Sequence, residues 1–313
     1  MSGLETASTG QTFYEQNREG LDSLFSIVGL PELTNKSLPE VVAATQPWVK
    51  GDHARPEHSF SFGVGQTAEL NEIYGSLGLR DAHELPPAIY DHTIVLGGVH
   101  RGNNRRLEFL GKALTRGNII TRDIMLLGGE RRVYPEVELD TIEGNLDKLA
   151  SVDEPWLDRA RKSDISLWWE TDLLRLAARI HLGPLTAEGH DHGPFNTLYR
   201  PHLQQFNWRN MPLAIMHTRA ISRQGEPRHT TEACMRDWLN TAQPTDNATV
   251  AFVAANPHMT RMGRSARAVL RSAGRSDIDL VVAGPASPDY VGHNHYLGEI
   301  ARHLYEDQRL LEA

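Results

Sequence analysis

Five short, mainly apolar runs, each followed by small or polar residues and then by a helical pattern, constrain the fold of this chain most strongly. Apolar runs bounded by turn residues are typical of buried strands. Strands that alternate with helices form a parallel sheet, because each return crossing between parallel neighbours needs a long connection. The runs span residues 93–96, 123–127, 212–216, 248–254 and 279–283.

This alternation predicts an α/β fold with a Rossmann-like open parallel sheet and helices on both faces. We expect a helical N-terminal region at residues 1–90 packed on the core, followed by the α/β domain at 91–313. Residues 131–210 break the strand rhythm and are predicted to be a helical insertion or lid. Helices are expected between and after the strands, at about residues 104–115, 230–241, 260–273 and 295–311.

The composition disfavours several function classes. With 40 acidic against 32 basic residues, the formal net charge is -8, which disfavours binding to nucleic acid or to an anionic membrane. Cys234 is the single cysteine, so no intramolecular disulfide can form, as expected in a reducing compartment. The sequence shows neither a signal-peptide pattern nor a membrane-spanning apolar run. We therefore expect a cytoplasmic protein, and a homo-oligomer is compatible with this composition.

In such sheets, ligands bind at the carboxyl ends of the strands. Two of the predicted strands end in glycine pairs, Gly97-Gly98 and Gly128-Gly129, where backbone N–H groups can approach an anion closely. One pair alone is better explained as a turn, but two in succession, each beside an arginine, favour an anion site. The predicted ligand-binding residues are Gly97, Gly98, Arg101, Asn103, Arg105, Gly128, Gly129, Thr230, Asn256 and Arg261.

Three residues are candidates for catalysis. His258 could transfer a proton near neutral pH, and Arg261, three residues later at a predicted helix start, could grip a phosphate or carboxylate. The structural alternative is that His258 caps the helix and Arg261 pairs with a surface acid. Glu130 could act as a general base, and Glu232 lies in the first turn of a helix that Thr230 can cap. For both acids, structural and functional explanations are balanced.

The strand ends resemble a known family, the SanA/ElyC/YdcF-like proteins. The matching residues, in order, are Leu96-Gly97-Gly98, Arg105 or Arg106, Gly128-Gly129, Thr230-Thr231-Glu232 and His258-Met259-Thr260-Arg261. The resemblance covers roughly residues 91–130 and 212–284, and each motif is short. It implies a Rossmann-like fold, and one branch of the family is described as binding S-adenosylmethionine. Ala233 stands where the family usually has Asn, which removes a side-chain amide from the site.

A metal site is not predicted, although two histidine pairs were considered for one. His190-Asp191-His192 and His293-Asn294-His295 carry ligand-type side chains two residues apart, but both pairs fall in predicted loops. No further cysteine or histidine motif completes a known zinc pattern. Cys234 lies in a predicted helix, where packing is a better explanation than nucleophilic chemistry.

Together these features predict a small-molecule enzyme, a transferase or hydrolase, that binds an anionic ligand at the carboxyl edge of the sheet. The ligand would be nucleotide-like, S-adenosylmethionine-like or phosphorylated. Neither the dinucleotide nor the P-loop fingerprint is present, so NAD or Walker-type ATP binding is unsupported. The alternatives are a non-catalytic metabolite-binding module and a metal-dependent hydrolase that uses the histidine pairs.

Overall fold

The computed structural model describes residues 11–49, 60–129, 131–187, 203–218, 221–223, 226–228 and 230–312. The chain divides into two compact units, which are described one at a time. The first unit comprises residues 1–82, 256–261 and 286–313, and the second comprises residues 83–255 and 262–285.

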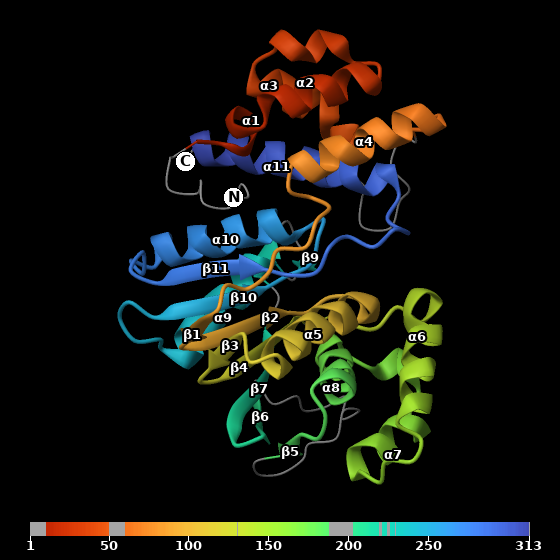
Figure 1. Ribbon diagram of the computed structural model, residues 1–313, viewed down its shortest axis with the longest axis vertical. Coiled ribbons are helices and arrows are strands. Elements are labelled where there is room, and N and C mark those ends of the chain that lie inside the picture. The colour runs from red at the N-terminus through yellow and green to blue at the C-terminus, as the bar shows by residue number, and fades with distance from the viewer. Residues whose placement is uncertain are drawn as a thin grey trace. The chain divides into compact units, whose positions relative to one another are not determined.

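A seven-stranded sheet forms the centre of the second unit (Figure 1). The strand order is β11-β10-β2-β4-β7-β6-β5. The first five strands in this order run parallel, whereas β6 pairs antiparallel with both β7 and β5. The strands are β2 (His92–Leu96), β4 (Ile124–Gly129), β5 (Thr186–Ala187), β6 (Leu203–Trp208), β7 (Met211–Thr218), β10 (Thr249–Val253) and β11 (Asp279–Ala283).

All five predicted strands are present and lie side by side in this one sheet. Their apolar side chains are buried, as expected for strands that are covered on both faces. The prediction of a Rossmann-like α/β fold is therefore confirmed. The sheet is not wholly parallel, however, because β6 and β5 extend its edge in the antiparallel sense.

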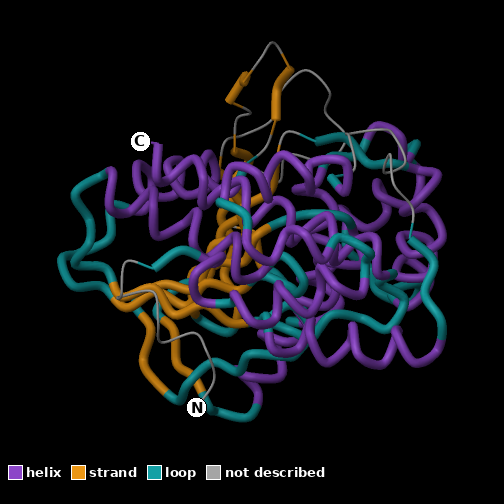
Figure 2. The backbone as a smooth tube through the Cα atoms, turned by 90° about the horizontal axis from the view of Figure 1, so that it is seen from above, coloured by secondary structure: helices purple, strands orange, loops and turns teal. Residues whose placement is uncertain are grey.

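Helices cover both faces of the sheet (Figures 1 and 2). On one face, α5 (His100–Thr115) and α8 (Glu170–His181) pack with apolar side chains of the strands into one cluster that includes Leu107, Leu174 and Leu126. On the other face, α9 (Thr231–Ala242) contacts β4 and β7, and α10 (Met259–Ser272) packs on β11. Side chains of a strand alternate between the two faces of the sheet, and helices cover both faces. Each parallel strand therefore carries apolar side chains on both sides.

The region predicted as a helical insertion contributes to the core of the second unit. It contains α6 (Pro135–Lys148), α7 (Pro155–Lys162), the 3-10 turn η4 (Ile165–Leu167) and α8. The helix α8 is buried along most of its length and connects β4 to the parallel strand β7 by way of β5 and β6. The strands β6 and β7 form a hairpin whose two turn residues, Arg209 and Asn210, have φ values of 49° and 65°.

The first unit is helical. It contains α1 (Phe13–Gln16), α2 (Arg18–Ile27), α3 (Leu38–Thr45), α4 (Val64–Ser76), α11 (His293–Glu312) and the 3-10 turns η2 (Pro31–Asn35) and η3 (Gln46–Trp48). The N-terminal helices share one apolar cluster with the buried side of α11, for example Leu21, Tyr74 and Ile300. The last helix therefore belongs to the same unit as the N-terminal helices, so a single boundary near residue 90 does not separate the two units.

Two small strand pairs complete the second unit. The strands β1 (Ala88–Tyr90) and β3 (Ile119–Thr121) pair in parallel, and β8 (Ile221–Arg223) and β9 (Glu226–Arg228) form a hairpin. This hairpin stands off from the main sheet at the top of Figure 2. Among the described helices of the chain, none combines the length and apolar character that crossing a membrane requires.

Candidate functional site

The glycine pairs that were expected to approach a ligand lie at the carboxyl ends of neighbouring strands. Gly97 and Gly98 follow β2, while Gly128 and Gly129 end β4. Since β2 and β4 are paired in parallel, all four glycines lie at one edge of the sheet. This is the edge at which α/β proteins of this class bind their ligands.

Side chains of the protein itself lie against these glycines. The Gly129 N–H donates a hydrogen bond of 3.0 Å to Oε1 of Glu170. A Cβ atom at Gly97 would lie 2.1 Å from the same Oε1, and one at Gly128 would lie 2.7 Å from Cγ2 of Thr171. Both contacts come from the first turn of α8. Glycine is required here because α8 approaches the strand ends too closely for a larger residue.

Arg131 connects two buried carboxylates at the same edge. Its Nε donates to Oε2 of Glu170 at 3.1 Å, and its Nη1 donates to Oε2 of Glu138 at 3.0 Å. Its Nη2 donates to the Gly98 carbonyl at 3.0 Å, and Glu138 also accepts the backbone N–H of His100. Burial lowers the pKa of Arg131, but the two facing carboxylates outweigh it and raise the pKa overall. The chain thus supplies its own anions to this edge.

Arg106 is the buried arginine of this region, whereas Arg105, predicted to bind the ligand, is partly exposed. The Nη1 of Arg106 donates to the carbonyls of Leu96 and Gly97, both at 2.8 Å. Burial lowers the pKa of Arg106 to about 10, and the Glu170 carboxylate acts in the opposite direction. The guanidinium therefore stays charged at neutral pH and holds the end of β2 in place.

The two other predicted ligand contacts of α5 have partners within the protein. Asn103 is buried, and its Nδ2 donates to the Gly98 carbonyl at 3.0 Å. Arg101 is exposed, and its Nε donates to Oγ1 of Thr141 at 3.0 Å. Asn103 therefore stabilises the turn after β2, while Arg101 lies at the surface.

The start of α9 shows the predicted helix cap. The Thr230 hydroxyl accepts the backbone N–H of Ala233 at 3.1 Å, and Glu232 is partly exposed in the first turn. Cys234 is buried, with its Sγ 3.3 Å from Oγ1 of Thr218. Burial raises the pKa of Cys234 to about 12, so it remains a thiol at neutral pH. This agrees with a packing role for the cysteine.

A second cluster of ionisable side chains lies in the first unit, around Glu299 of α11. The Glu299 carboxylate is fully buried. Its Oε2 lies 2.8 Å from Nδ1 of His258, and its Oε1 accepts Nε of Arg261 at 2.6 Å. Nη1 of Arg261 also lies 3.5 Å from Oε1 of Glu306. The predicted pair therefore does converge, but it converges on a buried acid of the chain.

The ionised carboxylate of Glu299 fixes which ring nitrogen of His258 faces it as the donor. Burial raises the pKa of Glu299, but the facing groups of His258 and Arg261 outweigh burial and hold that pKa well below its usual range. An ionised carboxylate can only accept hydrogen bonds, so Nδ1 of His258 carries the hydrogen. In neutral His258 the lone pair is then on Nε2, which lies 3.2 Å from Nε2 of His295.

Glu299 is the residue that the sequence interpretation missed. His295, Glu299, His303 and Glu306 follow one another at spacings of three or four along α11, so they lie on one side of the helix. Tyr296, Leu297, Ile300 and Leu304 form its apolar side. An acid in the middle of such a helix is usually assigned to solvent, and the opposing His258 and Arg261 compensate its charge in the buried site.

The remaining predicted residues have simpler placements. Asn256 is buried, and its Nδ2 donates to the Asp81 carbonyl at 2.6 Å. Glu130, His190 and His192 lie outside the described residues.

The helix α11 begins at His293, two residues before the predicted start at residue 295, so His293 and His295 lie in a helix and not in the loop expected for this pair. Side chains two apart on a helix point in different directions, so these two histidines cannot form the strand-like ligand pair considered from the sequence. Within the described part of the chain, no group of three or more histidine, cysteine, aspartate or glutamate side chains is arranged to hold a metal ion.

The expected common cavity would join residues of both units. Gly98, Gly129 and Thr230 belong to the second unit, and His258 and Arg261 belong to the first. Each unit has its own polar cluster, and the meeting of the two sets in one site stays a prediction.

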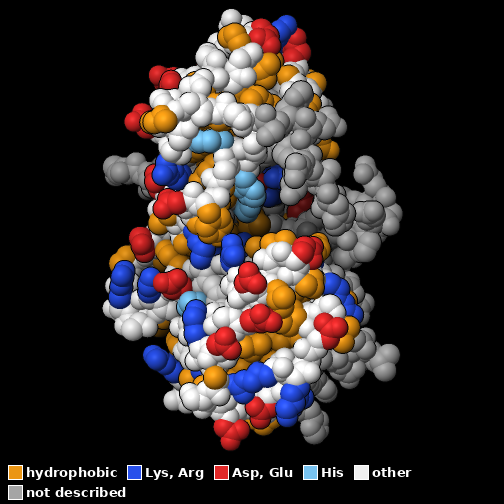
Figure 3. Space-filling view, turned by 90° about the vertical axis from the view of Figure 1, so that its right-hand side faces the viewer, with side chains coloured by type: hydrophobic (Ala, Val, Ile, Leu, Met, Phe, Trp, Pro, Cys, Tyr) orange, Lys and Arg blue, Asp and Glu red, His pale blue; other side chains and the backbone are white. Residues whose placement is uncertain are grey.

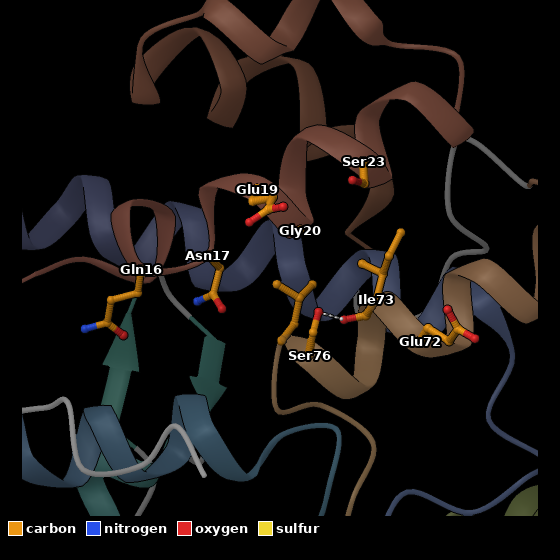
Figure 4. A pocket seen from close by; sticks show the side chains of 9 residues that line it. Gln16, Asn17, Glu19, Gly20, Ser23, Glu72, Ile73 and Ser76 are labelled. Carbon is orange, nitrogen blue, oxygen red and sulfur yellow. Dashed lines mark hydrogen bonds between the residues drawn. The ribbon is translucent and has the colours of Figure 1, made fainter. Parts of the chain in front are cut away.

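The first unit also contains an open cavity of about 430 Å³ between α2 and α4 (Figure 4). Its lining is mainly polar and exposed, and Ile73 and Leu77 are its buried members. The Ser76 hydroxyl bonds to the Ile73 carbonyl within α4. None of the predicted site residues lines this cavity, and its acids, Glu19 and Glu72, extend from different helices.

Charges of both signs are interspersed on the face of the protein in Figure 3, and histidine side chains reach its surface. Comparisons of the chain with protein-family models, with curated proteins and with solved structures found no match.

Proposed function

We propose that this chain is a small-molecule enzyme, a hydrolase or a transferase, in which His258 moves a proton during the reaction. The observation that carries the proposal is the 2.8 Å contact between Nδ1 of His258 and the buried Glu299 carboxylate. A carboxylate behind an imidazole fixes its tautomer and orientation and stabilises the imidazolium that forms when the other nitrogen takes a proton. His258 is then the catalytic residue and Glu299 a positioning residue.

Arg261 has a positioning role in this proposal. Its Nε holds the second oxygen of Glu299, and its Nη1 reaches Glu306. With one oxygen bonded to Arg261, the carboxylate keeps its other oxygen directed at His258. The sequence suggested that Arg261 grips the ligand directly, and these two carboxylates support an indirect role instead.

The proposed substrate is an anionic small molecule, phosphorylated or nucleotide-like. Arg302 supports an anion near His258, because its side chain is 34% exposed and its Nη1 lies 3.4 Å from Oε2 of Glu299. This distance is long for a charged hydrogen bond, so the guanidinium can turn toward a ligand at small cost.

A purely structural role is the competing explanation. The same contacts hold residues 258–261 against α11, and a buried ion pair alone is weak support for function. What favours chemistry is the exposure of His258, since a quarter of its side chain is accessible and the proton-accepting Nε2 points away from Glu299.

The test begins with mass spectrometry of small molecules released from the purified, denatured protein. Turnover is then measured on the compound found and on a panel of chromogenic phosphate and carboxylate esters. His258→Gln should lower kcat by about 10²- to 10⁴-fold, as expected for the loss of a general acid–base, with little change in KM.

His92→Gln is the matched control. Nδ1 of His92 lies 2.9 Å from Oδ2 of Asp123, and the side chain is 15% exposed. His92 begins β2, at the end of the strand opposite the glycine pair, so its loss should leave turnover unchanged. Turnover by folded His258→Gln equal to that of the wild type would remove His258 from the reaction. A retained ligand without any turnover by the wild type would favour a metabolite-binding module over an enzyme.

A further inference from the structure

The imidazoles of His258 and His295 approach each other through their Nε2 atoms, which lie 3.2 Å apart. Their ring centroids are 5.0 Å apart and their planes are inclined by 64°. His258 immediately precedes α10, and His295 lies in the first turn of α11, so two different elements bring the nitrogens together. His295 is exposed and a quarter of the His258 side chain is accessible, so solutes can reach the pair.

This distance fits two ligands of one metal ion. A Zn–N bond of about 2.05 Å with tetrahedral angles places two ligating nitrogens about 3.3 Å apart. The nitrogens of His258 and His295 are already within about 0.2 Å of that separation. A divalent transition metal therefore needs only small rotations of the two side chains.

The contact between His258 and the Glu299 carboxylate is also typical of a metal-binding histidine. Metal-binding histidines usually donate their second ring N–H to a carboxylate, which fixes the tautomer and raises the basicity of the ligating nitrogen. Here Nδ1 of His258 lies 2.8 Å from Oε2 of Glu299, and Arg261 holds the other oxygen at 2.6 Å. The lone pair of His258 is thereby directed at His295.

We propose that His258 and His295 form an exchangeable site for a divalent transition-metal ion such as Zn²⁺, with water or a small anion completing the coordination. Imidazole ligands favour zinc, nickel and copper over magnesium or calcium, which prefer oxygen. In consequence, and resting here on the proposed function, a bound ion occupies the lone pair with which His258 accepts a proton. The metal then acts as an inhibitor of the enzyme.

A direct hydrogen bond between the two imidazoles is the alternative explanation of the 3.2 Å contact. In that arrangement His295 donates its Nε2–H to His258, and no metal is needed. The two explanations differ in whether a transition metal competes successfully for the nitrogens, and this can be measured without a substrate.

The experiment is calorimetric titration of the chelator-treated full chain with Zn²⁺, and with Mg²⁺ as the hard-cation control. One zinc-binding event of the wild type should be lost in both His258→Gln and His295→Gln and retained in His92→Gln. Glu299→Gln should weaken the same event by about 10- to 100-fold, the usual effect of removing a carboxylate behind a ligating histidine. Co²⁺ bound in place of Zn²⁺ should give visible absorption bands that disappear in the same two histidine variants.

The outcomes separate this proposal from the proposed function. Zinc binding by folded His295→Gln with the stoichiometry and affinity of the wild type would overturn the metal site. If folded His295→Gln binds zinc like the wild type while His258→Gln still lowers kcat, the metal site is wrong and the enzyme proposal is retained. If instead zinc binds at the pair without slowing turnover, the metal site stands and the role of His258 as a base is contradicted.

Discussion

Removing the charge of Glu170 should destabilise the second unit, because this buried carboxylate holds the Gly129 turn and Arg131 at the strand ends. Glu170 is 6% exposed and accepts hydrogen bonds from the Gly129 N–H and from Nε of Arg131. Glu170→Gln keeps the size of the side chain but has only one acceptor oxygen. One of the two donors then loses its partner, and Arg131 loses one of its two counter-charges.

The expected cost follows from the burial of the pair. A hydrogen bond to a charged group contributes about 1.5–3 kcal/mol, and breaking a buried ion pair costs about 3–5 kcal/mol. Arg131 is 18% exposed and keeps Glu138, so the lower part of this range applies. We expect the free energy of unfolding to fall by about 2 kcal/mol in Glu170→Gln and by about 3 kcal/mol in Glu170→Ala.

Urea denaturation followed by tryptophan fluorescence reports mainly on the unfolding of the second unit, in which Glu170 lies. Five of the six tryptophans belong to the second unit, namely Trp156, Trp168, Trp169, Trp208 and Trp238. With an m value of about 1–3 kcal/mol per molar urea, a loss of 3 kcal/mol shifts the midpoint by about 1 M or more.

Glu154→Gln is the matched control in the same unit. Glu154 also accepts Nε of an arginine, Arg179, at 2.6 Å, but its side chain is 29% exposed, so its loss should cost less than about 1 kcal/mol. A double-mutant cycle of Glu170→Gln with Arg131→Gln should give a coupling of about 1–3 kcal/mol. Equal losses in Glu170→Gln and Glu154→Gln, or a coupling near zero, would refute the assignment of a buried network at the strand ends.

Three further outcomes follow from the structure. Gly97→Ala should cost about 1–3 kcal/mol in urea denaturation, since its Cβ would meet Glu170, whereas Gly144→Ala, with open space in α6, should stabilise by about 0.5–1 kcal/mol. Burial lowers the pKa of His100 from 6.5 to about 4, so the free energy of unfolding should fall by about 1.4 kcal/mol per unit as the pH drops through this range, and His100→Gln should remove this slope. Cys234 should resist iodoacetamide at pH 7 until the chain unfolds; rapid labelling of the folded protein would contradict its burial.

The five parallel strands were predictable because their apolar runs are short and end in turn residues. The hairpin of β6 and β7 was not, because its turn is Arg209-Asn210 rather than a pair containing glycine. Both residues nevertheless adopt positive φ, as two-residue hairpins require. In β6 only Phe206 and Trp208 are buried, so the strand has a weak apolar signal.

The glycines at the ends of β2 and β4 were expected to let a ligand approach the backbone, and ligand binding at this edge stays a prediction. In the structure a side chain of the chain itself lies against them, and the sequence did not show which one. The approaching group is Glu170, 41 residues after Gly129 along the chain. Likewise, the spacing of His258 and Arg261 predicts that the two side chains point the same way. Their common partner, Glu299, is distant in sequence, and no motif around it marks it as a buried acid.

The two clusters differ in whether a polar side chain remains accessible for a reaction. In the second unit, Arg131 donates to Glu138, Glu170 and the Gly98 carbonyl. Its guanidinium therefore stabilises the packing of α8 and α6 at the strand ends. In the first unit, Glu299 is satisfied by its partners, yet the His258 side chain is 27% exposed and its Nε2 faces that of the exposed His295. A group that is anchored on one side and accessible on the other can exchange a proton or a metal ion without unfolding its support. This asymmetry favours the proposed role of His258 over a role for the glycine-lined edge.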